Sequence, residues 1–321
     1  MNPILRTFGL AALGALVFIA IGLVVPAWFL FTMTKAVGFG LVALGLVGLL
    51  RGGLLSFGQG LYYCGGAYVS GLMANWAGVT DMIVLLSVGC IAGGLIAALV
   101  SPLVARYRGI FFAMLTMALS MVAYGVLTKI AAIGGSDGFN VPKPTLLGYH
   151  LAETGFGLYA IAVVTAALAA AVCRVHFDSG LGLIASAARE NELRIEYLGA
   201  SVFSVSTRSF ILAGGLAGLG GTLNGVALGH VDPFFSYWTT SGEMVFIAIL
   251  GGYASVTAVF GTALVTELVR SFSGQYFPES WQMLLGIFLL LVIVFLPRGV
   301  GSMWAKPARS HAIRSIKEPA T

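Results

Sequence analysis

The segment from Phe8 to Phe31 contains no charged residue, and comparably apolar stretches recur along most of the chain. A helix of this length can cross the roughly 30 Å hydrocarbon core of a bilayer. Because 59% of the residues are hydrophobic and the mean hydropathy is +0.98, a soluble fold would leave apolar surface in water. The first segment is interpreted as a retained span, since Pro26 to Phe31 offers no small-residue cleavage site for a signal peptide. The sequence therefore predicts an all-α, polytopic transmembrane helical bundle.

The hydropathy pattern divides the chain into about ten predicted spans, of which the eighth and ninth are short enough to be broken or re-entrant helices. The transmembrane domain is expected to cover residues 1–297, and residues 298–321 are expected to form a basic, disordered cytoplasmic tail. The predicted spans are 8–31, 36–50, 60–77, 82–103, 109–132, 156–173, 209–228, 241–254, 257–272 and 281–296.

The distribution of Lys and Arg sets the expected orientation. If the N-terminus is cytoplasmic, thirteen of the 17 Lys and Arg residues lie inside, and Lys35, Lys129, Lys143 and Arg270 lie outside or near the outer face. Cytoplasmic loops of membrane proteins carry such an excess of positive charge. With ten spans, both termini are then predicted to be cytoplasmic. Topology explains the basic pI of 9.2 better than nucleic-acid binding, so no nucleic-acid partner is expected.

The chain shows weak internal similarity at an offset of 165 residues. Residues 98–104 resemble residues 263–269, and Gly53-Leu54 matches Gly218-Leu219. Five spans in each half would invert the second half relative to the first, as in many transporters. Short apolar matches also arise by chance, so two inverted five-span halves and a bundle without a repeat both stay open.

Glycine is unusually frequent, at 44 of 321 residues, and many glycines lie inside apolar segments. Small residues in membrane helices let two backbones approach closely. A glycine cluster at 214–221 could be mistaken for a dinucleotide fingerprint, but no strand precedes it and no acidic residue follows at the expected distance. The cluster is interpreted as part of a helix-packing face formed by Ala213, Ala217, Gly218, Gly221 and Gly225.

The loop at residues 175–208 is the longest clearly polar segment on the predicted cytoplasmic side. Gly182 to Leu198 is expected to form one short amphipathic helix that ends at Gly199. Glu190 and Arg194 stand four residues apart, the favourable order for a helix-surface pair. A mixture of charged and exposed apolar residues suits insertion into a groove of a soluble partner. The alternative is an ordinary solvated connector. The candidate docking residues are Arg189, Glu190, Asn191, Glu192, Arg194, Glu196 and Gly199.

Polar residues within or beside the spans are candidate pathway residues, because they are costly in lipid. The alternative for each is that it only hydrogen-bonds a neighbouring helix. The external loop at residues 134–155 is the longest on the outer face, and it could either contact a ligand or form tight turns. The candidates from the spans and from this loop are Ser56, Gln59, Thr116, Ser136, Asp137 and Glu243.

The sequence offers no set of residues for catalysis or metal binding. The four His residues are dispersed without metal-ligand spacing, and the three Cys residues lie in separate apolar segments. No Gly-x-x-x-x-Gly-Lys-Ser/Thr phosphate loop occurs in these residues, so the chain is not expected to hydrolyse ATP by that route. We expect a protein that is not an enzyme and that holds no cofactor or metal.

Several motifs, taken in chain order, resemble those of the membrane subunits of branched-chain amino acid ABC importers, specifically the LivM-like permeases. They span roughly residues 50–300. Ile195 departs from the small residue that the family pattern predicts, and Ala258-Val259-Phe260 lacks an expected Gly-Pro. The matching segments are 55–58, 66–68, 108–116, 134–138, 187–192, 198–200, 217–221, 250–252 and 295–299.

The resemblance implies a permease in a bacterial inner membrane that pairs with a second homologous permease subunit. Two cytoplasmic ABC ATPase subunits would use ATP and bind the helix around residues 182–199, and a periplasmic or surface substrate-binding protein would deliver the solute. Branched-chain amino acids are the substrates that the resemblance implies, and related systems take urea, short amides or aromatic carboxylates. Two other hypotheses stay open: a secondary transporter or channel for a small polar solute, and a membrane-embedded scaffold or enzyme.

Overall fold

A computed structural model describes residues 3–146, 148–151, 155–252 and 255–295. Over these residues the fold is helical, as predicted, with four two-residue strands. The helices are α1 (Pro3–Gly22), α2 (Ala27–Arg51), α3 (Gln59–Trp76), α4 (Met82–Val104), α5 (Gly109–Leu127), α6 (Phe156–Asp178), α7 (Gly180–Glu190), α8 (Glu192–Tyr197), α9 (Val202–Leu228), α10 (Trp238–Gly251), α11 (Val256–Tyr276) and α12 (Trp281–Phe295). The remaining elements are the 3-10 helices η1 (Ala131–Ile133) and η2 (Pro233–Ser236) and the strands β1 (Phe139–Asn140), β2 (Thr145–Leu146), β3 (Tyr149–His150) and β4 (His230–Val231).

Six of these helices are long and apolar enough to cross a membrane: α1, α2, α4, α5, α6 and α9. Nine of the ten predicted spans each overlap a single α-helix, and the first, at residues 8–31, overlaps both α1 and the start of α2. Together the ten spans fall on α1 to α6 and α9 to α12. The helix α10 has only 14 residues, or about 21 Å at 1.5 Å per residue, which is shorter than the hydrocarbon core. The predicted tail at residues 298–321 lies outside the described residues.

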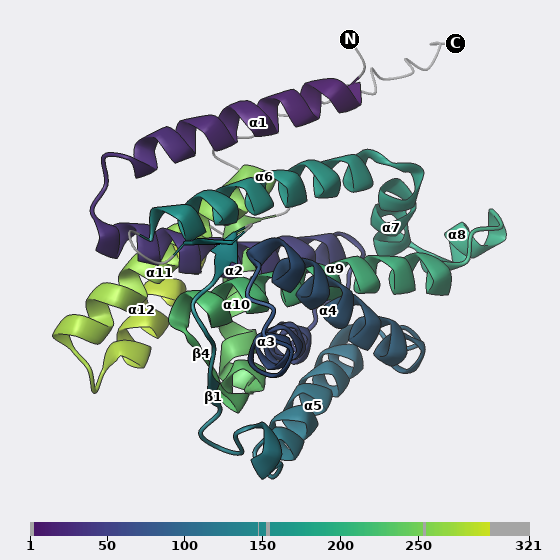
Figure 1. Ribbon diagram of the computed structural model, residues 1–321. Helices are drawn as coiled ribbons and strands as arrows, with labels where there is room; N and C mark the ends of the chain where they lie inside the picture. The colour runs from purple at the N-terminus through teal and green to yellow at the C-terminus, as the bar shows by residue number, and fades with distance from the viewer. Residues whose placement is uncertain (1–2, 147, 152–154, 253–254, 296–321) are drawn as a thin grey trace, which may run out of the picture.

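The prediction of a single first span over residues 8–31 is wrong in its bounds. Helix α1 ends at Gly22, and α2 begins at Ala27 directly after Pro26. Proline has no N–H to donate, and its fixed φ suits the start of a helix, so Pro26 separates two helices instead of lying within one. The first two predicted spans therefore correspond to α1 and α2. The boundary between the two helices lies at residues 23–26, earlier in the chain than the predicted boundary after Phe31. Helix α1 packs along α6 at the periphery (Figure 1).

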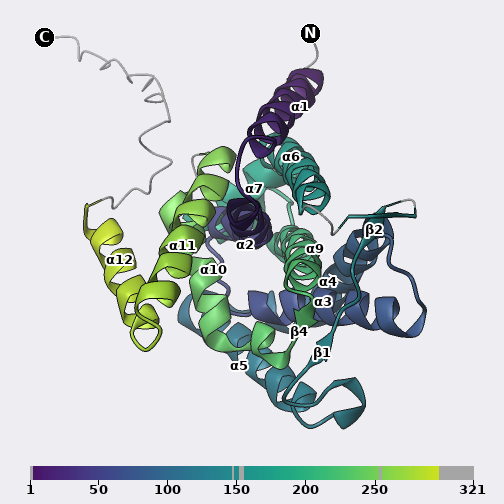
Figure 2. The ribbon, with the colours of Figure 1, turned by 60° about the vertical axis from the view of Figure 1, so that its left-hand side comes forward.

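Helix α9 is the centre of the bundle. It makes its most extensive contacts with α4, α2 and α3, and Figure 2 shows α2 and α9 surrounded by the other helices. A Cβ on Gly218 would overlap the backbone of Gly89, and a Cβ on Gly66 would overlap the backbone of Gly218. Only glycine permits three helix backbones to meet at this distance. The crossing of α3, α4 and α9 therefore depends on the absence of side chains.

The other residues of the predicted packing face also lie on the buried part of α9. Ala217 is fully buried, and a Cβ on Gly221 would overlap the Tyr63 backbone. Ala213 lies against Gly45 of α2, and Gly225 lies close to Ala67 of α3. These contacts involve two different neighbouring helices, because one helix in the middle of a bundle is covered on several sides.

Short helices lie at one end of the bundle, and the short strands lie away from that end. Helices α7 and α8 lie at one end, where α7 packs against the C-terminal part of α6 and the end of α2 (Figure 1). Short strands lie elsewhere: β1 pairs with β4, with Phe139 opposite Val231, and β2 pairs with β3. Asp81 at the start of α4 accepts a hydrogen bond from the N–H of Ile83 at 3.0 Å, which caps the helix.

The sequence offset of 165 residues connects the fourth helices of the two predicted halves, α4 and α11, but it does not connect equivalent positions along the helices. Gly53-Leu54 lies in the turn after α2, whereas Gly218-Leu219 lies in the middle of α9. Residues 98–104 end α4, whereas residues 263–269 lie within α11. An inverted repeat of five spans stays a prediction, but these matches do not support it.

The close crossing at α9 makes a prediction about stability. Replacing Gly218 by alanine should lower the melting temperature of the purified protein in detergent, because overpacking costs roughly 1–3 kcal/mol. Gly125 in α5 has no atom within 4 Å of the position that a Cβ would take, so Gly125→Ala is the matched control. Equal melting temperatures for the two variants would contradict the close packing of α9 against α4.

Candidate functional site

The polar segment that was expected to form one helix over residues 182–199 instead forms two, so that prediction is wrong. Helix α7 ends at Glu190 and α8 begins at Glu192. Asn191 adopts an extended backbone, and its side-chain oxygen accepts a hydrogen bond from the Arg194 N–H at 3.0 Å. Asparagine is among the best N-cap residues, so it ends one helix and starts the next. Glu190 and Arg194 consequently lie on different helices and do not form the expected pair.

A small apolar cluster attaches this α7–α8 segment to the bundle. Ala188 of α7, Ile195 of α8 and Val202 of α9 are buried together, with Ile184 and Ala200 packed beside them. Ile195, where the family pattern predicts a small residue, fills this cluster and is 8% exposed. The cluster gives the segment a fixed place against the start of α9, although its outer side faces solvent.

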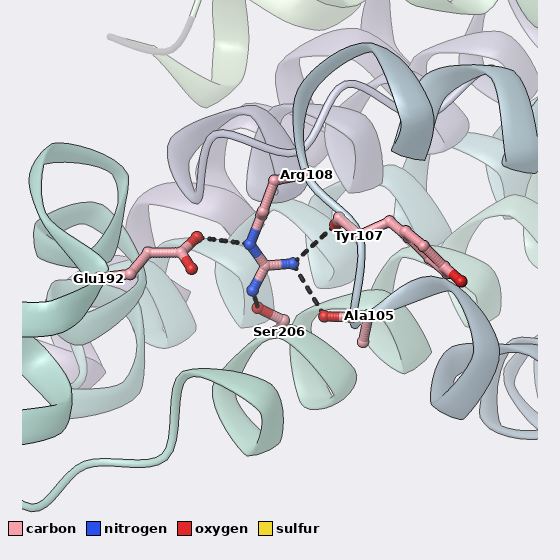
Figure 3. Close-up of polar contacts among 5 residues, drawn as sticks. All are labelled: Ala105, Tyr107, Arg108, Glu192 and Ser206. Carbon is pink, nitrogen blue, oxygen red and sulfur yellow. Dashed lines mark hydrogen bonds and ion pairs between the residues drawn. The ribbon is translucent and has the colours of Figure 1, made fainter.

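Arg108 provides the second attachment (Figure 3). It lies between α4 and α5, and its Nε donates to the Glu192 carboxylate at 2.5 Å. Its Nη2 donates to the Ser206 hydroxyl of α9 at 3.0 Å, and its Nη1 donates to the carbonyl oxygens of Ala105 and Tyr107. A planar guanidinium can make such divergent hydrogen bonds at once. One side chain therefore joins α8, α9 and the α4–α5 turn.

The solvent side of the α7–α8 segment carries large apolar residues beside charges. Leu193, Tyr197 and Leu198 are 66%, 89% and 77% exposed. Arg189 lies against Gly53 at the end of α2, and Gly199 follows α8 with a left-handed φ of 84°. Glu190, Asn191, Arg194 and Glu196 are exposed, while Glu192 is turned toward Arg108. An exposed apolar surface rimmed by charges is typical of a protein interaction site.

Replacing Arg108 by glutamine should loosen this attachment. The Glu192 pair is partly exposed, so the expected loss of local stability is about 1 kcal/mol, or roughly fivefold faster amide exchange in α8. Hydrogen-exchange mass spectrometry of residues 192–197 measures the effect. Arg106, an exposed residue two positions earlier, provides the control Arg106→Gln. Unchanged exchange in Arg108→Gln would show that the apolar cluster alone holds the segment.

A second polar region lies inside the bundle, where the chain between α2 and α3 is not helical. Ser56 on this stretch and Gln59, the first residue of α3, are fully buried. The Thr116 hydroxyl of α5 accepts a hydrogen bond from the Phe57 N–H at 3.1 Å. Both amide atoms of Gln59 are buried, and neither has a hydrogen-bond partner among the described residues. Three of the predicted pathway residues, Ser56, Gln59 and Thr116, are thus in one neighbourhood.

Three serines that the sequence analysis did not single out complete this region. Ser120 of α5 and Ser236 of η2 exchange two hydrogen bonds through hydroxyl and carbonyl oxygens, at 2.7 and 2.8 Å. The Ser241 hydroxyl of α10 accepts a hydrogen bond from the Gly60 N–H at 2.9 Å. The N-terminal ends of α3 and α10 therefore meet here. Sequence patterns could not identify these serines, because their hydrogen-bond partners lie more than 100 residues away in the chain.

Two ion pairs lie within the helical bundle. Glu243 of α10, a predicted pathway residue, accepts a hydrogen bond from Arg270 of α11 at 3.0 Å. The ammonium of Lys35 on α2 lies 2.5 Å from the carboxylate of Glu267 on α11, which is only 4% exposed. The sequence analysis assigned Lys35 and Arg270 to the outer face by topology alone and did not pair them.

The other candidate residues lie apart from these regions. The Ser136 hydroxyl donates to the Asp137 carboxylate at 3.0 Å on the exposed loop after η1. This loop passes close to β4, since a Cβ on Gly138 would overlap the Val231 carbonyl oxygen. Within the described residues, no group of three or more His, Cys, Asp or Glu side chains could hold a metal ion.

Long apolar helices, a close-packed centre and polar groups inside the bundle define a multi-pass membrane transport protein. A family model described as the permease component of a branched-chain amino acid transport system matches residues 28–294. The chain belongs to this family. Its members are permease components and not enzymes, and the family and the apolar helices place the chain in the bacterial inner membrane.

Two curated relatives carry the same name, the high-affinity branched-chain amino acid transport system permease protein LivM. The protein from Escherichia coli K12 is 29% identical to this chain, and that from Salmonella typhimurium LT2 is 28% identical. Each match covers 77% of this chain and 64% of the relative, so the chain spans somewhat less than two thirds of their length. No solved structure matches the chain.

Proposed function

We propose that this chain is a translocation subunit of an ATP-driven importer for branched-chain or related amino acids. The observation that carries the proposal is the α7–α8 segment, which exposes Leu193, Tyr197 and Leu198 to solvent while Arg108 and Ile195 fix its inner side. A segment that is exposed on one side and fixed to the bundle on the other can bind a soluble partner and transmit the movement of that partner to the bundle. The family of the chain and the names of its relatives support the class of substrate.

We further propose that all ten helices matching the predicted spans are embedded in the membrane, with both termini in the cytoplasm. Arg51 ends α2 beside α7, Arg108 lies between α4 and α5, and Arg189 lies on α7. These basic residues gather at the end of the bundle that carries the α7–α8 segment, which supports a cytoplasmic position for that end. Strands β1 and β4 then belong to the outer face, where the loop containing Ser136 and Asp137 would receive a substrate-binding protein.

The mechanism follows from the attachments of the α7–α8 segment. Two ATPase subunits bind its exposed side and close on ATP. Because Arg108 connects α8 to α9 and to the α4–α5 turn, a displacement of α8 is transmitted directly to the central helix. The chain and a second homologous permease subunit then open the pathway alternately to each side. The chain holds no cofactor of its own, and the ATP is used by its partners.

A secondary transporter or channel is the second candidate. The two partly buried ion pairs within the bundle favour it, because ion-coupled transporters place charged residues within the membrane. Affinity purification of the tagged chain from native membranes distinguishes the importer from the secondary transporter or channel. An importer should bring a second multi-pass subunit and phosphate-loop ATPases, and its uptake should stop when ATP is depleted. A chain that purifies alone and whose uptake is abolished by an uncoupler would support the secondary transporter.

The same co-purification, followed by uptake with each candidate solute, tests the substrate. Leucine, isoleucine or valine should be taken up with the highest kcat/KM if the class that the relatives' names state also holds here. Urea, short amides and aromatic carboxylates are the alternatives. Preferred uptake of one of these solutes would support the proposal of an importer but contradict branched-chain amino acids as its substrates.

Replacing Tyr197 by alanine should weaken association with the ATPase subunits. A large exposed aromatic residue is typical of an interface hot spot, so the expected loss is about 2 kcal/mol, or roughly thirtyfold in Kd. Tyr149 is 82% exposed outside the α7–α8 segment, and Tyr149→Ala is the matched control. Quantitative co-purification and ATP-driven uptake measure the effect. If both variants retain the ATPases equally, the docking proposal is wrong for this surface.

A further inference from the structure

A cavity of about 390 Å³ opens between α2 and α11. This volume is within the range of small-molecule sites. Its lining combines charged, hydroxyl and apolar groups, namely Phe31, Thr32, Lys35, Glu267, Arg270, Ser271, Gly274 and Pro278. Lys35 lies sixteen residues before Arg51 on α2, so the cavity is about 24 Å from the end that packs against α7. It is therefore separate from the α7–α8 segment.

Two cations and one anion line the cavity, and a second anion, Glu243, lies behind it as the partner of Arg270. We name Lys35, Glu243, Glu267 and Arg270 the four-charge cluster. Lys35 pairs with Glu267, and Arg270 pairs with Glu243 from the neighbouring helix α10. The Arg270 guanidinium also lies 5.6 Å from the centre of the Phe39 ring. The cluster thus joins three helices and has no net charge when all four groups are ionised.

A purely structural role explains this arrangement poorly. Removing charged groups from water is costly, and replacing a buried ion pair by apolar residues is often neutral or stabilising. Charged side chains inside a membrane are rare and commonly mark a solute or ion pathway. Here Lys35 is about 12 Å along α2 from the start of that helix, so it does not belong to the first helical turn. The whole of the first pair and the Arg270 side of the second also line one cavity.

From the geometry we infer that this cavity binds a zwitterion, a ligand that carries one ammonium and one acidic group. A lone anion would meet the Glu267 carboxylate, and a lone cation would meet Lys35 and Arg270. A zwitterion can place its acidic group toward Arg270, which has five N–H donors, and its ammonium toward Glu267. Phe31 and Pro278 provide an apolar wall for an aliphatic side chain. The inference rests on the proposed function and deepens it by naming how an amino acid is held.

Two sources can supply such a ligand: a free amino acid, or the headgroup of phosphatidylethanolamine. The test uses the complex in nanodiscs of phosphatidylglycerol, an anionic lipid that has no ammonium group, and radiolabelled L-leucine as the probe. We expect saturable binding that unlabelled leucine displaces. Isoamylamine, which lacks the carboxylate, and 4-methylpentanoate, which lacks the ammonium, should fail to displace it at the same concentration. Displacement by either single-charge analogue would overturn the inference.

Variants that neutralise a whole ion pair avoid leaving one buried charge unpaired. Lys35→Gln with Glu267→Gln, and Glu243→Gln with Arg270→Gln, should each reduce leucine affinity at least about tenfold, since charge-assisted hydrogen bonds are lost. Their melting temperatures, measured in parallel, report whether they fold. Lys129→Gln, an exposed lysine just after α5, is the control. Folded variants that bind leucine as tightly as the unmodified chain would overturn the inference.

Repeating the measurement with phosphatidylethanolamine in the nanodiscs distinguishes the two sources. If this lipid lowers leucine binding and native mass spectrometry detects it on the unmodified chain but not on the paired variants, the headgroup occupies the cavity. ATP-driven uptake by the same preparations separates this inference from the proposed function. Uptake that is normal in both paired variants contradicts the zwitterion site alone, whereas leucine binding without any ATP-driven uptake contradicts the importer alone.

Discussion

The contact of backbone with backbone at Gly218 is the constraint on which the rest of the structure depends. Apolar side chains gain little by leaving lipid for a protein interior, so close packing has to hold membrane helices together. Gly66, Gly89 and Gly218 bring α3, α4 and α9 into that contact, and α9 in turn packs on α2. The small residues of α9 let the neighbouring helices approach its backbone closely.

Polar groups concentrate where this regular packing stops. The chain between α2 and α3 leaves backbone groups without helical partners, and hydroxyl groups such as those of Thr116 and Ser241 satisfy them. Unsatisfied backbone groups are costly in lipid, so a break in a membrane helix is tolerated only where neighbouring protein groups satisfy it. This explains why the buried hydroxyls come from helices that are distant in the sequence. Because several neighbouring helices supply these hydrogen bonds, a small movement of the chain between α2 and α3 alters several of them at once.

Local features of the chain were predictable, and contacts over long distances were not. Ten apolar segments followed from hydropathy, because a helix in lipid requires a continuous apolar sequence. The division at Pro26 and the break at Asn191 were missed, although both residues favour a helix start, since the apolar and amphipathic patterns continue across them. The pairing of Lys35 with Glu267 could not be predicted, because it depends on how α2 and α11 pack and not on either segment alone.

The α7–α8 segment and the four-charge cluster lie at opposite parts of α2, and this separation has a mechanical consequence. Both contact helices that pack on the rigid α9 crossing: Arg108 joins α8 to α9, and Lys35 lies on α2. A packed core has discrete arrangements and does not deform continuously. In the proposed mechanism, a displacement of α8 would therefore reach the cluster as a shift of whole helices, which would separate α2 from α11 or bring them together. Ion pairs between these two helices are sensitive to such a shift, because their energy depends strongly on distance. A solute held by the same charges would be released by the same movement.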